Sequence, residues 1–92
     1  MEFVWDPKKE KENIRKHGIP FSEAVTVFYD PLAKISSDPD HSEDEDRFIL
    51  IGQSQKRHLL FVVHVYRAEG ERVRIISARK ATKREISSFQ EI

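Results

Sequence analysis

The sequence of 92 residues has the length of one small domain, which we assign to residues 1–92, and its 38% hydrophobic and 35% charged residues suit a soluble fold with a modest core. It contains no cysteine, which excludes disulfides and thiolate metal sites. No stretch approaches the length of a membrane-spanning helix, and the first residues lack a basic start followed by an apolar signal core, so we expect a cytoplasmic protein without a membrane segment.

The formal net charge is zero, but the acidic residues are concentrated in one segment. Six of the sixteen acids lie within Asp38–Asp46, which contains no Lys or Arg. The rest of the chain therefore carries sixteen basic against ten acidic residues, a balance of +6. Segregation of this kind permits a basic binding surface on a neutral protein.

The chain starts with a short strand candidate, Phe3–Trp5. Asp6 is a preferred N-cap and Pro7 a preferred first helical residue, which predicts a helix from here to about His17. Gly18 is the natural left-handed stop for that helix.

A second helix is predicted from Ser22, its candidate N-cap, to about Tyr29. Its apolar stripe has helical spacing and consists of Ala24, Val25, Val27 and Phe28. Two strands are then expected on either side of the acidic segment, Leu32–Ser37 and Arg47–Gln53.

The segment Leu59–Lys80 is rich in β-branched residues and predicts two long strands joined by the short connection Ala68–Gly70. Thr82 and Glu85 have the spacing of a capping box, which predicts a last amphipathic helix carrying Ile86, Phe89 and Ile92. The order β-α-α-β-β-β-β-α predicts an α+β domain in which helices pack on one face of an antiparallel sheet.

A trial register of the hairpin places Arg67 opposite Glu71. One face, which includes Val63 and Val65, is then mostly apolar and should meet the helices. The other face is cationic and aromatic near the turn, and it pairs Tyr66 with Arg72 and His64 with Arg74. A slip of one residue or a bulge would change these partners.

The side chains that could take part in binding or catalysis are Arg, Lys, His and Tyr residues on the predicted strands. No phosphate-binding glycine loop, HExxH or GxSxG motif occurs, and the four histidines are not paired at metal-ligand spacing, so we expect neither a metal nor a cofactor. Arg, Lys, His and Tyr side chains without a metal site are the groups that a metal-free ribonuclease uses. Such an enzyme needs a base for the ribose 2′-hydroxyl, an acid for the leaving 5′-oxygen, and cations that bind the phosphate. His64 is the candidate acid or base and Tyr66 a base-stacking residue, and phosphate would be clamped by Arg67, Arg74 and Arg79.

Structural roles are the alternatives for the same residues. His64 could be an ordinary strand residue, and Arg79 could form an ion pair with Glu85 instead of acting on RNA. His17 beside Gly18 is most simply a cation at a helix C-terminus. The alternative function for the whole chain is that of a non-catalytic module whose basic face docks an acidic partner segment.

Several blocks of this sequence, taken in order, resemble one family. The run Phe3–Lys8 matches, and the blocks Lys16–Ile19 and Arg74–Arg79 are specific. The other matched positions are Asn13, Phe21, Glu23, Ala24, Val27, Phe28, Asp30, Pro31, Arg47, Ile51, Gly52, Val62, Val63 and Arg67. In these blocks the chain resembles BrnT-type toxins of bacterial type II toxin–antitoxin systems, and the likeness covers nearly its whole length.

The resemblance implies a RelE-like fold, a toxic ribonuclease activity that blocks translation, and a BrnA-type antitoxin as partner. The antitoxin would supply the contacts with operator DNA. The matched polar residues are His17, Arg47, Arg67 and Arg79. Phe89 stands where many relatives have Tyr, and His64 stands where Tyr or Thr is more usual.

We therefore expect two groups of site residues. The catalytic candidates are Arg67, Arg79, His64 and His17. The candidates for binding RNA phosphate or bases are Arg47, Arg74, Tyr66 and Lys80. The sequence leaves open which residue is acid or base, whether cleavage requires the ribosome, the RNA preference and the stoichiometry with the antitoxin.

Overall fold

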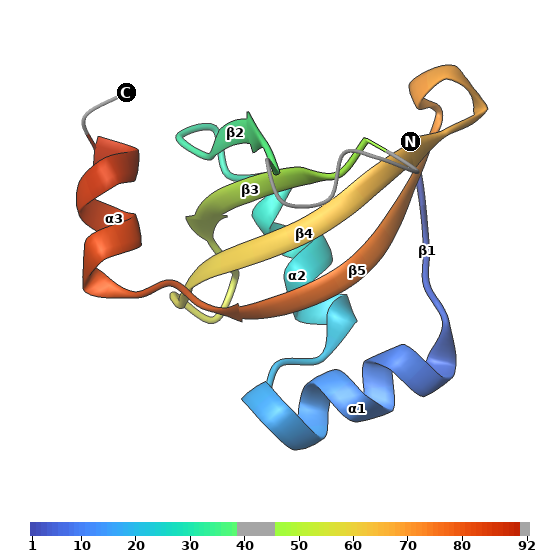
Figure 1. Cartoon of the computed structure of the whole chain (residues 1–92), viewed down its shortest axis with the longest axis horizontal. Helices are drawn as coiled ribbons and strands as arrows, with labels where there is room; N and C mark the ends of the chain where they lie inside the picture. The colour runs from blue at the N-terminus through green and yellow to red at the C-terminus, as the bar shows by residue number, and fades with distance from the viewer. Residues whose placement is uncertain (39–45, 91–92) are drawn as a thin grey trace.

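The computed structural model describes residues 1–38 and 46–90 (Figure 1), so the acidic segment is described only at its two ends. The predicted order of strands and helices is confirmed. The elements are β1 (Glu2–Val4), α1 (Pro7–His17), α2 (Phe21–Val27), β2 (Lys34–Ser37), β3 (Phe48–Gln53), β4 (Leu59–Arg67), η1 (Ala68–Gly70), β5 (Arg72–Lys80) and α3 (Lys83–Gln90).

Within the described residues, five strands form one sheet in the order β1-β5-β4-β3-β2. The pairs from β2 to β5 are antiparallel as predicted, whereas β1 runs parallel to β5, so the sheet is mixed. A strand of three residues carries no pattern that reveals the direction of its partner. The parallel pair arises because α1, which follows β1, packs alongside β5 and leaves β1 at that edge (Figure 1).

The two N-terminal helices cover one face of the sheet and enclose the core. The fully buried core residues include Phe21 and Val27 from α2 and Leu60, Val62, Val73 and Ile75 from the strands. The prediction that the helices pack on one face of the sheet is correct for α1 and α2. The third helix, α3, lies instead beside Ile49, Ile51 and Phe61 of the opposite face.

The predicted helix caps can be checked against the hydrogen bonds. Asp6 accepts from the Lys8 N–H (2.8 Å), and Gly18 ends α1 in the left-handed region with φ 72°, so both caps of α1 are confirmed. The cap predicted at Ser22 is wrong, because α2 already starts at Phe21. The Phe21 N–H donates instead to the Glu10 carboxylate of α1 (2.9 Å), a cap from a distant part of the sequence.

The capping box at the start of α3 is confirmed. The Glu85 N–H donates to the Thr82 hydroxyl (3.1 Å), and the Glu85 carboxylate accepts from the Thr82 N–H (2.8 Å). These local hydrogen bonds alone fix the position of the Glu85 side chain at the start of α3.

The trial register of the hairpin is wrong. Arg67 lies opposite Arg72, Tyr66 opposite Val73, and His64 opposite Ile75. The shift arises because Glu71, which was expected to pair with Arg67, belongs to the turn: its φ and ψ are −77° and −20°, and its N–H donates to the Ala68 carbonyl. The register also changes between Val63 and His64. The apolar face expected to meet α1 and α2 is consequently the opposite one, and Leu60 and Val62 face the helices instead.

Candidate functional site

Four arginines lie on the sheet face that is opposite α1 and α2. Arg67 and Arg72 are cross-strand partners, Arg74 lies opposite Val65, and Arg79 lies opposite Phe61. Because partners in a sheet project to the same side, all four guanidinium groups belong to one face. We term this surface, defined by Arg67, Arg72, Arg74 and Arg79, the arginine face.

Three of these arginines surround a hollow at the β1 edge of the sheet. Arg67, Arg72 and Arg74 line it together with Val4–Asp6, and its volume is about 460 Å³. The Arg72 Nε donates to the Glu2 carboxylate (2.6 Å). Arg74 is half-buried, and within residues 1–38 and 46–90 no hydrogen bond or ion pair engages its guanidinium. Arg74 is therefore the cation of this hollow that is available to an anion.

Arg79 is engaged by a neighbouring carboxylate. Its two terminal nitrogens donate to the two oxygens of Glu85 at 2.8 and 2.7 Å, and its guanidinium stacks on the Phe61 ring at 4.1 Å. The hydrogen bonds from Arg79 lower the pKa of Glu85 to about 2. The ion pair that the sequence offered as an alternative for Arg79 is thus present in the structure.

This ion pair predicts a dependence of stability on pH. A carboxyl group whose pKa falls from 4.5 to about 2 on folding stabilises the fold above about pH 4.5 and loses that contribution as the pH falls toward 2. Allowing for solvent screening, we expect Glu85→Gln to lower the free energy of unfolding by about 2 kcal/mol at pH 7. Gln keeps the oxygen that caps α3, so the change isolates the charge.

Urea unfolding of wild type and Glu85→Gln at pH 7 and at pH 2.5 measures this difference. The two proteins should approach equal stability at the lower pH. An equal difference at both pH values would contradict the assignment of the effect to the Glu85 charge.

His64 lies in the core and not on the arginine face. Its side chain has an exposed fraction of 0%, and its ring packs edge-on against Phe28 with centroids 4.9 Å apart. Its Nε2 lies 3.3 Å from the Tyr66 hydroxyl. Burial lowers the pKa of His64 to about 4, so the imidazole is neutral at pH 7. A ring that solvent does not reach has no contact with RNA in this conformation.

The buried His64 also predicts a pH effect, in a different range. The unfolded chain binds a proton with a pKa near 6.5 and the folded chain only near 4, so stability falls as the pH drops between these values. This group alone should lower the free energy of unfolding by up to about 3 kcal/mol between pH 7 and pH 4. His64→Leu should lack that part of the pH dependence.

An NMR titration of the imidazole Cε1 protons provides the direct check on His64. Its resonance should titrate with a midpoint near 4, in a protein that is still folded. A midpoint near 6.5 would show that the ring is accessible and would return His64 to the list of proton-transfer candidates.

The other predicted residues lie at several places around the sheet. Tyr66 is half-buried beside the Phe48 ring (5.4 Å), and burial raises the pKa of its hydroxyl. Lys80 is exposed at the end of β5, opposite Leu60. Arg47 directly precedes β3, and its carbonyl oxygen accepts from the Asp38 N–H (2.8 Å). The structure therefore does not bring the eight candidates together in one cluster.

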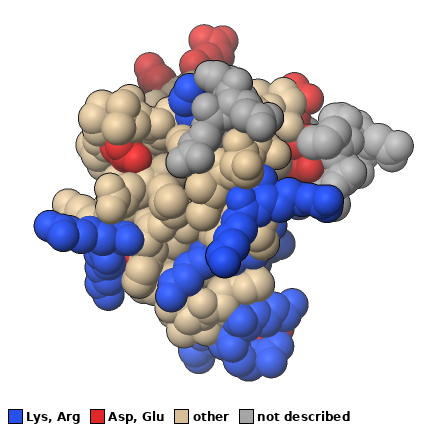
Figure 2. All heavy atoms as spheres, turned by 90° about the vertical axis from the view of Figure 1, so that its left-hand side faces the viewer, with Lys and Arg blue, Asp and Glu red and all other residues tan. Residues whose placement is uncertain are grey.

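His17 ends α1 beside a second hollow along β5. It is exposed, and with Lys9, Lys16 and Ser77 it borders a space of about 200 Å³. Ser77 lies opposite Val63 and thus on the side of the arginine face. Figure 2 shows Lys and Arg side chains gathered over the lower part of the molecule, at the level of α1.

Sequence reasoning missed the segment Val4–Asp6 at the end of β1, which lines the hollow of Arg67, Arg72 and Arg74, here termed the arginine hollow. Trp5 packs edge-on against Phe21 (6.1 Å) and also lines the hollow beside Asp6. Only the pairing of β1 with β5 brings these residues next to the arginines. The signal available from sequence was their place in the block Phe3–Lys8, which the resemblance had already singled out.

A second missed cluster holds the turn between β3 and β4. The buried Glu23 carboxylate accepts from the Ser54 hydroxyl and lies 2.7 Å from His58 Nδ1. Burial raises the pKa of Glu23, but the hydrogen bonds from Ser54 and His58 outweigh it and the net shift is downward. These contacts tie the turn to α2 and satisfy the polar groups of the buried Glu23 and Ser54.

Two searches of the described part of the chain gave negative results. No group of three or more His, Asp or Glu side chains there is placed to hold a metal ion. No helix among residues 1–38 and 46–90 has the length and apolarity needed to cross a membrane.

The fold and the surface define a class of protein, a small α+β domain that presents a row of arginines on a sheet face. The family described as "Ribonuclease toxin, BrnT, of type II toxin-antitoxin system" matches residues 5–85. The chain therefore belongs to the BrnT family of ribonuclease toxins.

The fold is also that of a solved structure. The chain is similar to the crystal structure of the Brucella abortus ribonuclease toxin, BrnT, with a TM-score of 0.66 and 24% sequence identity over 90% of this chain and 99% of that one. At this identity the likeness establishes the α+β fold. No curated protein sequence matches the chain.

Proposed function

We propose that this ribonuclease toxin is a metal-independent RNA endonuclease that arrests translation and acts in the cytoplasm. The observation that supports this most directly is the arginine hollow, in which Arg74 is half-buried and has no partner among the described residues. A guanidinium in such a place binds phosphate strongly, because it offers a planar pair of N–H donors and is partly shielded from water. Arg67 and Arg72 add positive charge at the same point.

Proton transfer requires a group that RNA can reach. We assign it to His17, because it is exposed whereas His64 is buried. Ser77, beside His17, lies three residues along β5 from Arg74, or roughly 10 Å. One RNA strand that follows this edge of β5 would contact both hollows. The phosphodiester would be oriented by Arg74, and the 2′-hydroxyl of the adjoining ribose would give its proton to the imidazole as its oxygen bonds to phosphorus. The bond from phosphorus to the 5′-oxygen then breaks, and that oxygen takes a proton from water.

The remaining cations flank this path. We propose that Lys80 and Arg47 hold neighbouring phosphates, and that Arg79 contributes charge from its ion pair with Glu85. Tyr66 lies next to His64 and supports the sheet, with only its partly exposed edge left for RNA.

The partner of this toxin would be a BrnA-type antitoxin. We propose that it neutralises the toxin by covering the arginine face and that it carries the contacts with operator DNA. The position of the arginine face supports neutralisation by contact, because its cations lie on an open surface where an acidic segment can pair with them.

The test of this function is expression in bacteria. Inducing the chain alone should stop growth and the incorporation of labelled amino acids, with cleavage of messenger RNA. Co-expression of the antitoxin should restore both. Normal growth in the presence of soluble, folded toxin would contradict the proposal and favour a non-catalytic binding module.

A further inference from the structure

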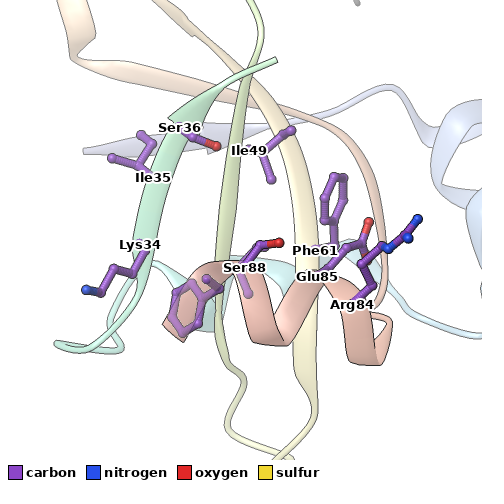
Figure 3. A pocket seen from close by; sticks show the side chains of 10 residues that line it. Lys34, Ile35, Ser36, Ile49, Phe61, Arg84, Glu85 and Ser88 are labelled. Carbon is purple, nitrogen blue, oxygen red and sulfur yellow. The ribbon is translucent and has the colours of Figure 1, made fainter. Parts of the chain in front are cut away.

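A mostly apolar groove lies between α3 and the sheet, on the side of the arginine face. Its volume is about 280 Å³. Figure 3 shows one wall formed by strands β2 to β4 and the other by α3. The apolar side chains that face it are Ile49, Ile51, Phe61 and Phe89.

The groove opens next to a free edge of the sheet. Within the described residues β2 pairs with β3 alone, so its other edge has no neighbouring strand. Three of its four residues are exposed, and Ile35 has an exposed fraction of 51%. Unpaired backbone groups beside an apolar groove are the features that favour addition of an extended segment from another chain.

The charges at the groove are basic. Lys34 lies at one end and Arg84 at the other (Figure 3). Among the described residues that line the groove, the acidic one is Glu85, and Arg79 binds it. A segment with a carboxylate placed to meet Arg84 and with apolar side chains beside it matches this arrangement.

RNA does not match this groove as well. Its walls are mostly apolar, and the described groups that could donate to a phosphate are few: the cations at the two ends and the hydroxyls of Ser36 and Ser88. An extended peptide, in contrast, places alternate side chains on one side, where they can enter the groove while its backbone pairs with β2.

We propose that an extended, acidic and apolar segment of the antitoxin docks here, pairing with the edge of β2 and inserting its apolar side chains between α3 and β3. This docking site rests on the proposed neutralisation by an antitoxin. A segment bound in this groove would lie on the same side of the sheet as the arginine face. Its binding would leave the ion pair between Arg79 and Glu85 intact.

The test measures antitoxin affinity for purified full-length toxin variants by calorimetry, with the purified BrnA-type antitoxin as probe. Ser36→Glu, at the position of β2 that lies opposite Ile49 on the groove side, and Arg84→Glu should each weaken binding at least tenfold, because they introduce negative charge into the groove. The matched controls are Ser87→Glu, an exposed serine of α3, and Lys83→Glu, the neighbour of Arg84; neither residue lines the groove. Both controls should bind within about twofold of wild type.

The outcomes separate this inference from the proposed function. Wild-type affinity in both groove variants would overturn the docking site and leave neutralisation standing elsewhere. No binding by the wild type would remove neutralisation itself. Altered self-association of the free groove variants would assign the groove to a second copy of this chain, and altered RNA cleavage would assign it to RNA; either result overturns the proposal.

Discussion

Replacing Arg74 by alanine is expected to lower RNA cleavage by about 100-fold or more while the protein stays folded. The guanidinium has no partner among the described residues and borders the hollow with Arg67 and Arg72, so its removal deletes the phosphate contact without breaking an ion pair. The measurement is the single-turnover rate on a labelled RNA.

Two further variants make the Arg74 result specific. Arg74→Lys keeps the charge but loses the planar pair of donors, so it should retain only part of the rate. Arg84→Ala makes the same chemical change as Arg74→Ala on the exposed surface of α3 and should cleave at the wild-type rate. A full rate in Arg74→Ala would remove the arginine hollow from the mechanism.

Replacing Asn13 by alanine is expected to destabilise the fold by about 3 kcal/mol or more, because three buried hydrogen bonds are lost together. Its amide nitrogen donates to the carbonyl oxygens of Ile19 and Ala78, each at 2.8 Å, and its oxygen accepts from the Ala78 N–H at 3.0 Å. One side chain thus joins α1, the α1–α2 connection and β5. Asn13 has an exposed fraction of 5%, so water cannot replace the lost partners.

Thermal unfolding provides the measurement for Asn13. For a domain of this size, a loss of 3 kcal/mol corresponds to a fall in Tm of roughly 12 to 24 °C. Lys11→Ala, an exposed change on the same helix, should alter stability by less than about 0.5 kcal/mol. A small effect at Asn13 would mean that α1 is held to β5 mainly by other contacts.

The elements that depend on local chemistry were predictable from sequence. Asp6 and Pro7 start α1, Gly18 ends it, and the pair Thr82 and Glu85 starts α3, each through contacts within a few residues. The start of α2 was not predictable, because its cap comes from Glu10 on another helix.

The hairpin register shows where local reasoning ends. Ala68 and Glu69 adopt positive φ values of 53° and 56°, a conformation that non-glycine residues seldom take, and the register also changes next to His64. Each of these features moves side chains to different partners. The residue types of the site were therefore predicted, but not which of them share a face. The trial register placed Arg72 and Arg74 on the face of His64 and Arg67 on the other, whereas the structure puts these arginines on one face and His64 on the opposite one.

Cleavage of an end-labelled RNA by the purified toxin in EDTA, followed by analysis of the product ends, tests the central claim most directly. A metal-independent attack by the 2′-hydroxyl predicts cleavage that persists in EDTA and leaves a 2′,3′-cyclic phosphate and a 5′-hydroxyl end. Cleavage that requires a divalent metal ion, or products with 5′-phosphate ends, would contradict the account.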